Sequence, residues 1–186
     1  MKSLKEYIKE SEELPKIYLD MDQVLSGFLE KSDIILEKFG CPRFNDEGWN
    51  ELGEETADDV RWAVIMKHEG FWTKLPFLRE GRRLWEFVRK YKPGILSQSQ
   101  YRMTNCKEEK MIWLNEHLGN DNLSDVHISD DLKDKTKYAI SESGRSNILI
   151  DDRYENCEAF RESGGIAIQF VDAKSAIREL KKLGFK

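Results

Sequence analysis

Five short apolar runs, separated by polar and turn-forming residues, constrain the fold of this chain more than any other feature of its sequence. They occupy residues 16–20, 94–97, 125–129, 147–151 and 165–170. Short runs rich in β-branched residues are typical of strands buried in a parallel sheet. Helical patterns occupy residues 3–13, 103–118, 153–163 and 173–183. This alternation predicts an α/β fold, a doubly wound parallel sheet flanked by helices.

The stretch from residue 26 to residue 77 breaks this alternation. It contains helical patterns at residues 28–39 and 57–68, joined by a loop at 41–46, and shows no convincing strand. About fifty residues between the first two strands are too many for one crossover helix. We therefore expect a small helical cap, residues 26–77, inserted after the first strand of a core domain formed by residues 1–25 and 78–186. Such an insertion would lie over the carboxyl ends of the strands, where open α/β sheets bind ligands.

The charge balance limits the partners that we expect. With 30 basic and 35 acidic residues, the net charge of −5 disfavours strong general nucleic-acid binding but leaves a small anionic substrate open. The three cysteines are far apart and include no CxxC pair, which favours a reducing compartment. No apolar run reaches the ~20 residues that span a bilayer, and the N-terminus lacks the apolar stretch of a secretory signal. We expect a soluble, cytoplasmic protein without a membrane partner; a homodimer stays open.

Polar side chains end three of the predicted strands. Asp20 and Asp22 follow the first strand, Ser97 ends the second, and Asp151 and Asp152 end the fourth. Because the carboxyl ends of parallel strands meet at one edge, four carboxylates would converge there and repel one another. A cation such as Mg²⁺ relieves this repulsion, and it prefers carboxylates together with a substrate phosphate. One acid at a strand end is as readily a helix N-cap, but the set of four favours a metal site.

A lysine in the helix after the second strand would complete this site. Lys110 lies in the predicted helix at 103–118, and Lys107 is its rival one turn earlier. On the helix pattern alone, a solvated surface lysine is the simpler interpretation of each. A site of carboxylates and a metal needs a cation to hold a phosphoryl oxygen, however, so Lys110 is our candidate.

Four segments in this order resemble the four motifs of the haloacid dehalogenase (HAD) superfamily of phosphohydrolases. They are residues 17–25 (Ile-Tyr-Leu-Asp-Met-Asp-Gln-Val-Leu), 95–97 (Ile-Leu-Ser), Lys110 and 149–152 (Leu-Ile-Asp-Asp). The resemblance extends over about residues 16–172 and implies a HAD-like Rossmannoid core with a small cap. Residues 20–28, 70–76 and 106–114 are similar to segments of the 5′(3′)-deoxyribonucleotidase group.

The resemblance implies a role for each acidic motif residue. Asp20 would be the nucleophile that forms an aspartyl-phosphate, and Asp22 would protonate the leaving alcohol and then activate water. Mg²⁺ would be held by Asp20, by the backbone carbonyl of Asp22 and by Asp152. Asp151 would be a second ligand or would orient the first.

The phosphate-binding residues and their surroundings depart from the group's pattern in three places. Ser97 and Lys110 would bind the non-bridging phosphate oxygens, and Ser97 keeps the hydroxyl of the Thr that is frequent there. Gln23 stands where the group commonly has Gly. Its side chain would lie near the site entrance, where we expect it to alter the specificity for the leaving group. Residues 98–100 replace a Ser-Pro segment, so the group's contacts there do not carry over; Gln98 is a substrate-binding candidate.

The predicted cap is rich in aromatic residues, namely Phe28, Trp49, Trp62, Phe71 and Trp72. These rings would either stack on a base or form the small core of the cap itself. We expect Trp62 to pack in that core, because apolar residues surround it on its helix face. Phe28, Phe71 and Trp72 are our substrate-binding candidates, because the resemblance places them by the base pocket.

The sequence therefore predicts a Mg²⁺-dependent phosphomonoesterase that acts through an aspartyl-phosphate. Its expected substrate is a small-molecule phosphomonoester, a (deoxy)nucleoside monophosphate. The alternative is a HAD phosphatase for another leaving group, such as a sugar phosphate or a polynucleotide 3′-phosphate. A non-catalytic HAD-like binding protein is the weaker alternative, because all the motif acids and Lys110 are present.

Overall fold

The computed structural model describes residues 14–44 and 54–186, so the predicted helix at 3–13 and Trp49 lie outside the described residues. Within these ranges five strands form one sheet in the order β3-β2-β1-β4-β5. The strands are β1 (Ile17–Leu19), β2 (Gly94–Gln98), β3 (Val126–Ser129), β4 (Ile148–Asp151) and β5 (Ile166–Gln169). Every neighbouring pair is parallel, which confirms the predicted α/β class.

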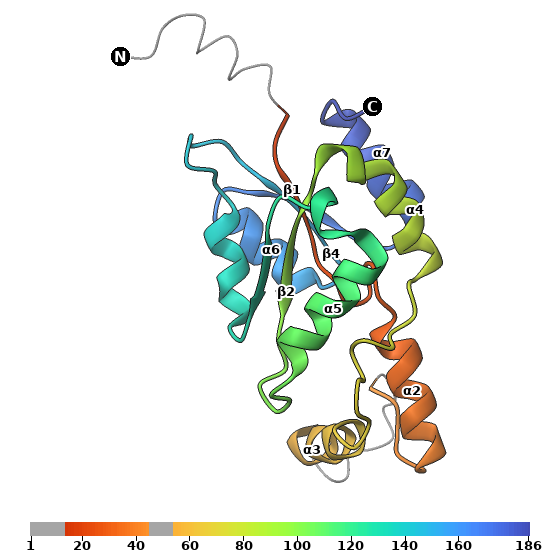
Figure 1. Cartoon of the computed structure of the whole chain (residues 1–186). Coiled ribbons are helices and arrows are strands. Elements are labelled where there is room, and N and C mark those ends of the chain that lie inside the picture. The colour runs from red at the N-terminus through yellow and green to blue at the C-terminus, as the bar shows by residue number, and fades with distance from the viewer. Residues whose placement is uncertain (1–13, 45–53) are drawn as a thin grey trace, which may run out of the picture.

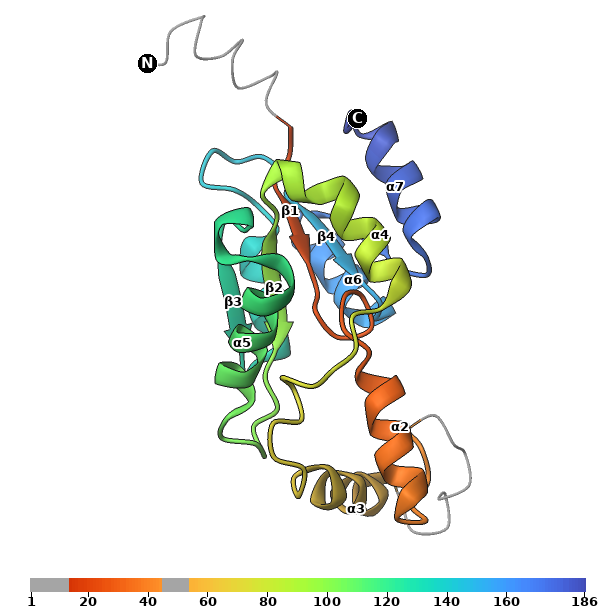
Figure 2. The same cartoon turned by 45° about the vertical axis from the view of Figure 1, so that its right-hand side comes forward.

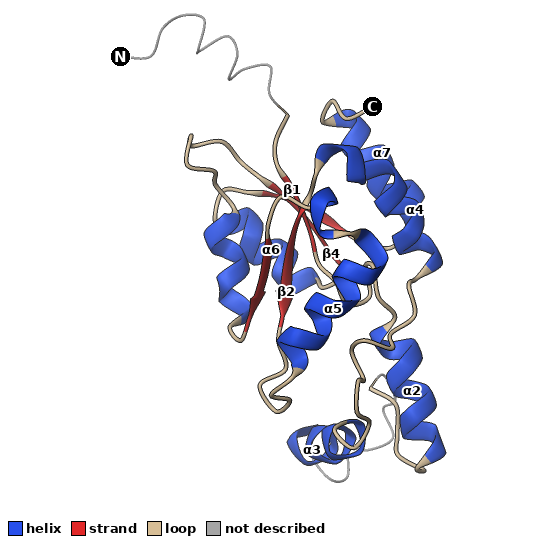
Figure 3. Ribbon diagram, viewed as in Figure 1, coloured by secondary structure: helices blue, strands red, loops and turns tan. Residues whose placement is uncertain are grey.

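Helices cover both faces of the sheet (Figure 1, Figure 3). One face carries α4 (Arg79–Val88), α5 (Cys106–Leu118) and α7 (Ala173–Lys182). The other carries α6 (Tyr154–Glu162) and the 3₁₀ segment η4 (Leu132–Tyr138), and short 3₁₀ turns lie at η2 (Arg89–Tyr91) and η3 (Asn120–Asn122). No helix in the described ranges has both the length and the apolar character needed to cross a membrane.

The central strands are apolar up to their carboxyl ends because they are buried on both faces. In β1, Ile17 and Leu19 pack into the core under α4, α5 and α7. Tyr18, between them, points to the opposite face and joins the smaller core under α6, with Leu149 and Phe160. Successive strand residues point to opposite faces, so a strand covered on both sides needs an unbroken apolar run.

The described residues of the range 26–77, which we call the cap segment, stand apart from the sheet beyond the carboxyl end of β1 (Figure 2). Their helices are α2 (Phe28–Lys38) and α3 (Glu54–Ile65), which pack against each other. The segment leaves and rejoins the sheet at one place, where Ser26 pairs with Phe77 and the Gly27 amide donates to the Pro76 carbonyl at 2.8 Å. The division into core and cap at these residues stays a prediction.

Candidate active site

Three carboxylates meet where β1 and β4 end. Asp20 directly follows β1, and its backbone amide donates to the carbonyl of Ile150 in β4 at 2.9 Å. One oxygen each of Asp20, Asp151 and Asp152 lies within 4.8 Å of the others, and we call these three residues the acid cluster. Three hard oxygen donors this close together fit a divalent cation such as Mg²⁺.

Lys135, which the sequence analysis missed, lies between two acids of this cluster. Its ammonium group is 2.8 Å from Oδ1 of Asp20 and 2.6 Å from Oδ2 of Asp151, and its side chain is only 7% exposed. It comes from η4, just before β4 in the chain. The signal in the sequence was a lysine-rich stretch at residues 133–137, but a short 3₁₀ turn gives no periodicity that would show which lysine points inward.

Burial and charge together shift the pKa values of these groups. Burial raises the pKa of Asp20 to about 7; Lys135 opposes the rise, and the charge of Asp151 adds to it. Burial and the charge of Asp151 likewise raise the pKa of Asp152 to about 6. Burial alone would lower the pKa of Lys135, but Asp20 and Asp151 overcome it and raise that pKa to about 12. The protein therefore provides one cation for three closely spaced acids, which leaves room for a second positive charge.

The carboxylate of Asp151 is the most firmly held of the cluster. It is completely buried, and Oδ1 accepts from the backbone amide of Arg153 at 2.9 Å. The side-chain amide of Asn156 donates to both oxygens, at 3.0 and 3.1 Å. With Lys135 also bound, Asp151 is fixed by its neighbours, whereas Asp152 is partly exposed.

A second lysine joins Asp22 to the end of β2. Lys110 in α5 is fully buried, and its ammonium group is 2.6 Å from Oδ2 of Asp22 and 3.0 Å from Oγ of Ser97. The same group donates to the backbone carbonyl of Gln98 at 2.6 Å. The hydroxyl of Ser26 donates to the other oxygen of Asp22 at 3.0 Å. The structure thus brings together Asp22, Ser97 and Lys110, which the sequence analysis had chosen separately.

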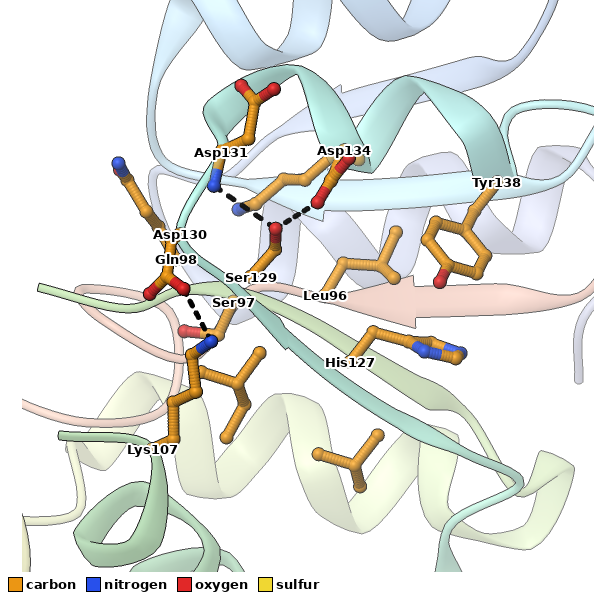
Figure 4. Close-up of a pocket in the computed structure, with 13 residues that line it drawn as sticks. Leu96, Ser97, Gln98, Lys107, His127, Ser129, Asp130, Asp131, Asp134 and Tyr138 are labelled. Carbon is orange, nitrogen blue, oxygen red and sulfur yellow. Dashed lines mark hydrogen bonds and ion pairs between the residues drawn. The ribbon is translucent and has the colours of Figure 1, made fainter. Parts of the chain in front are cut away.

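The rival lysine points elsewhere, into a second cavity of about 520 Å³ at the edge strand β3 (Figure 4). There the Lys107 ammonium pairs with Asp130 at 2.6 Å, and the Ser129 hydroxyl donates to Asp134. This cavity shares Gln98 and Lys135 with the cavity of the acid cluster. Lys107 thus pairs with an acid outside the acid cluster, whereas Lys110 contacts Asp22, which lines the same cavity as Asp20 and Asp152. The geometry therefore favours Lys110 over Lys107 as the lysine of the site.

A cavity of about 560 Å³ connects the acid cluster with the cap segment. On the sheet side it is lined by Asp20, Asp22, Lys135 and Asp152. On the other side it is lined by four rings that we call the aromatic wall, Phe28, Phe44, Trp62 and Trp72. Polar side chains in its lining include Gln23, Asp58, Gln98 and Arg153. The cavity therefore has a charged end suited to an anion and an apolar end suited to a flat group.

Phe28 is the centre of the aromatic wall. Its ring centre is 5.3 Å from that of Phe44, 5.7 Å from that of Trp62 and 5.5 Å from that of Trp72. Trp62 packs in the cap segment as expected, at 8% exposure, but it also faces the cavity. Phe71 is 1% exposed, does not line the cavity and lies edge-on against Trp72. Phe71 therefore supports the wall and has no surface to offer a substrate.

Trp72 differs from the other rings because it also covers Lys110. The Lys110 ammonium lies 4.4 Å from the centre of the Trp72 ring, and Trp72 as a whole is 3% exposed. Its indole Nε1 is buried without a hydrogen-bond partner among the described residues. A base has little of this ring to stack on, so the main contact of Trp72 in the site is with the lysine.

Comparisons with known proteins identify the fold. No family model matches the sequence, and no curated protein matches it. Among solved structures, a hydrolase from Streptococcus pneumoniae aligns with a TM-score of 0.60 at 12% identity, over 90% of this chain and 98% of that chain. The L-2-haloacid dehalogenase from Xanthobacter autotrophicus gives 0.55 at 13% identity, over 91% of this chain and 83% of that chain.

A third structure in this group was solved with ligands. It is a HAD-family enzyme from Bacteroides thetaiotaomicron, an Asp-to-Ala variant in complex with magnesium and inorganic phosphate. It aligns with a TM-score of 0.50 at 14% identity, over 86% of this chain and 95% of that chain. The chain therefore has the fold of HAD-superfamily hydrolases.

Proposed function

We propose that this protein is a HAD-superfamily hydrolase, specifically a Mg²⁺-dependent phosphomonoesterase that acts through an aspartyl-phosphate. One observation carries the proposal: Asp20, Asp151 and Asp152 converge within 4.8 Å, and Lys135 bridges two of them. A nucleophilic carboxylate beside a cation site is the arrangement that phosphoryl transfer needs, because the dianionic phosphate must be neutralised before an anion can attack it.

The two aspartates after β1 would divide the chemistry between them. A carboxylate oxygen of Asp20 attacks phosphorus, and the bond from phosphorus to the leaving oxygen breaks as Asp22 gives that oxygen a proton. Asp22 then takes a proton from water, whose oxygen attacks the phosphorus of the aspartyl-phosphate. This second step releases inorganic phosphate and restores the Asp20 carboxylate.

The remaining charged groups would hold the phosphate. Ser97 and Lys110 would donate to its non-bridging oxygens, and a phosphate oxygen that engages Lys110 would release Asp22 to face the leaving oxygen. Asp20, the Asp22 carbonyl and Asp152 would hold Mg²⁺, which when bound neutralises charge on the phosphate. Asp151 would orient Lys135 and the cluster, because protein groups already engage both of its oxygens.

The same fold also occurs in a dehalogenase, so the fold alone does not decide between dehalogenation and phosphate-ester hydrolysis. The side chains of the site must decide it. A halide leaves as a stable anion and needs no proton, whereas an alkoxide leaving group does. Asp22, with its carboxylate in the cavity beside Lys110 and Ser97, supplies an acid for an alcohol. The two buried lysines also match the charge of a phosphate better than that of a carbon–halogen bond.

For the leaving group we propose a nucleoside, which makes the protein a 5′(3′)-deoxyribonucleotidase-like enzyme. The support is the aromatic wall, which faces the acid cluster across a cavity of about 560 Å³ and offers flat apolar surface to a base. In this proposal residues 26–77 are a cap that selects the leaving group, and Phe28 replaces Phe71 and Trp72 as the main stacking ring.

A substrate panel tests the proposal. We expect phosphate release from deoxynucleoside monophosphates to exceed that from sugar phosphates and from a 3′-phosphorylated oligonucleotide, and to disappear with EDTA. Asp20→Asn should abolish turnover, because an amide cannot attack phosphorus. Full Mg²⁺-dependent activity in that variant would disprove the mechanism, and turnover of sugar phosphates alone would disprove the nucleotide assignment.

A further inference from the structure

Helix α3 presents two neighbouring side chains to the cavity, one acidic and one aromatic. Asp58 and Trp62 are four residues apart, so they lie on the same face of the helix. Both line the cavity that contains Asp20, and the Asp58 side chain is 43% exposed. An acid at this place is unexpected, because the opposite end of the cavity is already rich in carboxylates.

A buried arginine fixes the position of this carboxylate. Arg61 is 7% exposed in its side chain, and its Nη1 donates to Oδ1 of Asp58 at 3.0 Å. Its Nε donates to the carbonyl of Pro42 at 3.3 Å, and its guanidinium lies 5.4 Å from the ring centre of Phe44. Oδ2 of Asp58 accepts no hydrogen bond from the described residues. Asp58 is thus a held carboxylate with an oxygen left for a ligand.

The aromatic wall defines what such a ligand would look like. The ring centres of Phe28, Phe44 and Trp62 are 5.3 to 5.7 Å apart, and all three line the cavity with Asp58. A flat ring that lies against them has its edge in the same cavity as this carboxylate. A carboxylate only accepts hydrogen bonds, so it attracts an edge that carries a donor and repels one that carries a carbonyl oxygen.

We propose that Asp58 is a specificity-determining residue that accepts a hydrogen bond from an amino group on the leaving group. This inference rests on the proposed function, and it narrows that function to nucleotides whose base carries an exocyclic amino group. Uracil and thymine present a carbonyl where cytosine presents an amino group. In the same position these bases would place the C4 carbonyl against the Asp58 carboxylate. Their N3–H donor lies one ring atom further along the edge, between two carbonyl oxygens, so Asp58 would face an acceptor in a partly desolvated site.

The cleanest test compares deoxycytidine and deoxyuridine 5′-monophosphates, whose bases differ only in the amino or carbonyl group at C4 and the adjoining ring proton. We expect wild-type kcat/KM to favour deoxycytidine monophosphate by roughly 10- to 100-fold. Asp58→Asn should bring the ratio to within about threefold of one, because an amide can donate to the carbonyl as well as accept from the amino group.

Asp59→Asn is the matched control. It removes the same charge from the next residue of α3, but Asp59 does not line the cavity and pairs with Arg102 at 2.5 Å. We expect it to leave the ratio of the two kcat/KM values unchanged. A ratio lost in Asp58→Asn and kept in Asp59→Asn supports the proposal.

Some results would disprove the role of Asp58 alone, and another would also disprove the nucleotidase function. If the wild type turns over both nucleotides equally or prefers deoxyuridine monophosphate, or if Asp58→Asn keeps the wild-type ratio, Asp58 has no such role although the nucleotidase function stands. If no nucleotide is hydrolysed while sugar phosphates are, both the nucleotidase function and the role of Asp58 are disproved.

Discussion

The two ends of the cavity are built on opposite principles. At the sheet, Asp20, Asp22 and Asp151 each contact a buried lysine at 2.6 to 2.8 Å. At the cap segment, the aromatic wall is held by ring packing, with the pair of Asp58 and Arg61 as its charged element. Charged groups in fixed pairs suit a reaction that needs exact charge placement, whereas packed rings suit recognition of a flat group.

This difference predicts how substitutions at the two ends will act. A change at the sheet end should lower turnover of every substrate alike, because it alters the groups that meet the phosphate. A change at the wall should alter the ratio between substrates, because the wall would touch only the leaving group. Trp72 is the exception, since it also contacts Lys110. The predictions below test this division or the residues that connect the two ends, and the expected effects decrease from the first to the last.

Lys135→Met should have the largest effect. The substitution leaves Asp20 and Asp151 buried without the cation that now contacts both, so the carboxylates repel each other and the nucleophile loses its position. We expect kcat to fall by about 10²- to 10³-fold on every substrate. Steady-state kinetics with saturating Mg²⁺ measures this, and circular dichroism shows whether the variant folds.

Lys137→Met is the control for this experiment. Lys137 lies two residues further along η4, and its side chain is 71% exposed. Its loss should leave kcat within about twofold of the wild type, since surface ion pairs contribute little. An equal loss of activity in both variants would show that the lysine-rich stretch acts through its net charge and not through the contact with Asp20.

The acids at the sheet end were predictable, and Lys135 was not, for one physical reason. Strand ends in a parallel sheet meet at one edge whatever the connections are, so Asp20 and Asp152 could be brought together from the sequence. Lys110 lies in a helix that the sequence predicted, but its choice over Lys107 came from the need for a cation to hold a phosphoryl oxygen and not from the helix pattern. Lys135 lies in a 3₁₀ turn whose direction depends on packing against α6, which no local pattern encodes.

The wall was only partly predictable for a similar reason. Its composition was visible, but which ring faces the cavity depends on how α2 and α3 pack. Phe71 and Trp72 are adjacent in the sequence, yet only Trp72 lines the cavity. Phe44 and Asp58 were not chosen at all, because a loop phenylalanine and an acid on a polar helix face look like ordinary surface residues.

Mg²⁺ binding should depend strongly on pH. The folded pKa values of Asp20, about 7, and Asp152, about 6, lie above the ordinary value of 3.8, so the metal-free protein loses stability as pH rises from 3.8 to about 7. Protons and Mg²⁺ compete for these carboxylates. We therefore expect affinity for Mg²⁺ to fall by about tenfold per pH unit below the pKa of Asp20, and more steeply below the pKa of Asp152, where a second proton competes.

Thermal unfolding with and without Mg²⁺ measures this effect. The increase in Tm caused by Mg²⁺ should be several degrees larger near about pH 8 than near about pH 5.5. Asp152→Asn removes a ligand and should show little increase at either pH. Equal increases in the wild type at both values would mean that Mg²⁺ binds away from the acid cluster.

Trp72→Phe sharpens the comparison, because Trp72 belongs to the wall but contacts Lys110. A smaller ring weakens the attraction between the ring and the Lys110 ammonium, so kcat should fall by about 3- to 10-fold. The ratio between nucleotides should not change. The matched control is Trp85→Phe in α4, which shortens a tryptophan of similar burial outside the cavity and should lower Tm without lowering kcat. Equal kcat in Trp72→Phe and the wild type would refute the contact.

Gln23 links the two ends, and replacing it should have the smallest effect. Gln23 and Lys92 have left-handed backbones, with φ of 59° and 48°, which cost a non-glycine residue about 1 kcal/mol. Lys92→Gly should therefore stabilise the fold by up to about 0.5 kcal/mol, after the added flexibility of the unfolded chain is counted.

Gln23→Gly removes the same backbone strain as Lys92→Gly. It also loses the hydrogen bond from the Gln23 side-chain amide to Glu30 in α2, at 2.9 Å, so the stability of this variant should stay near that of the wild type. Urea unfolding of both variants gives the difference directly. A loss above about 1 kcal/mol in Gln23→Gly alone would show that the Gln23 side chain stabilises the fold by more than one exposed hydrogen bond.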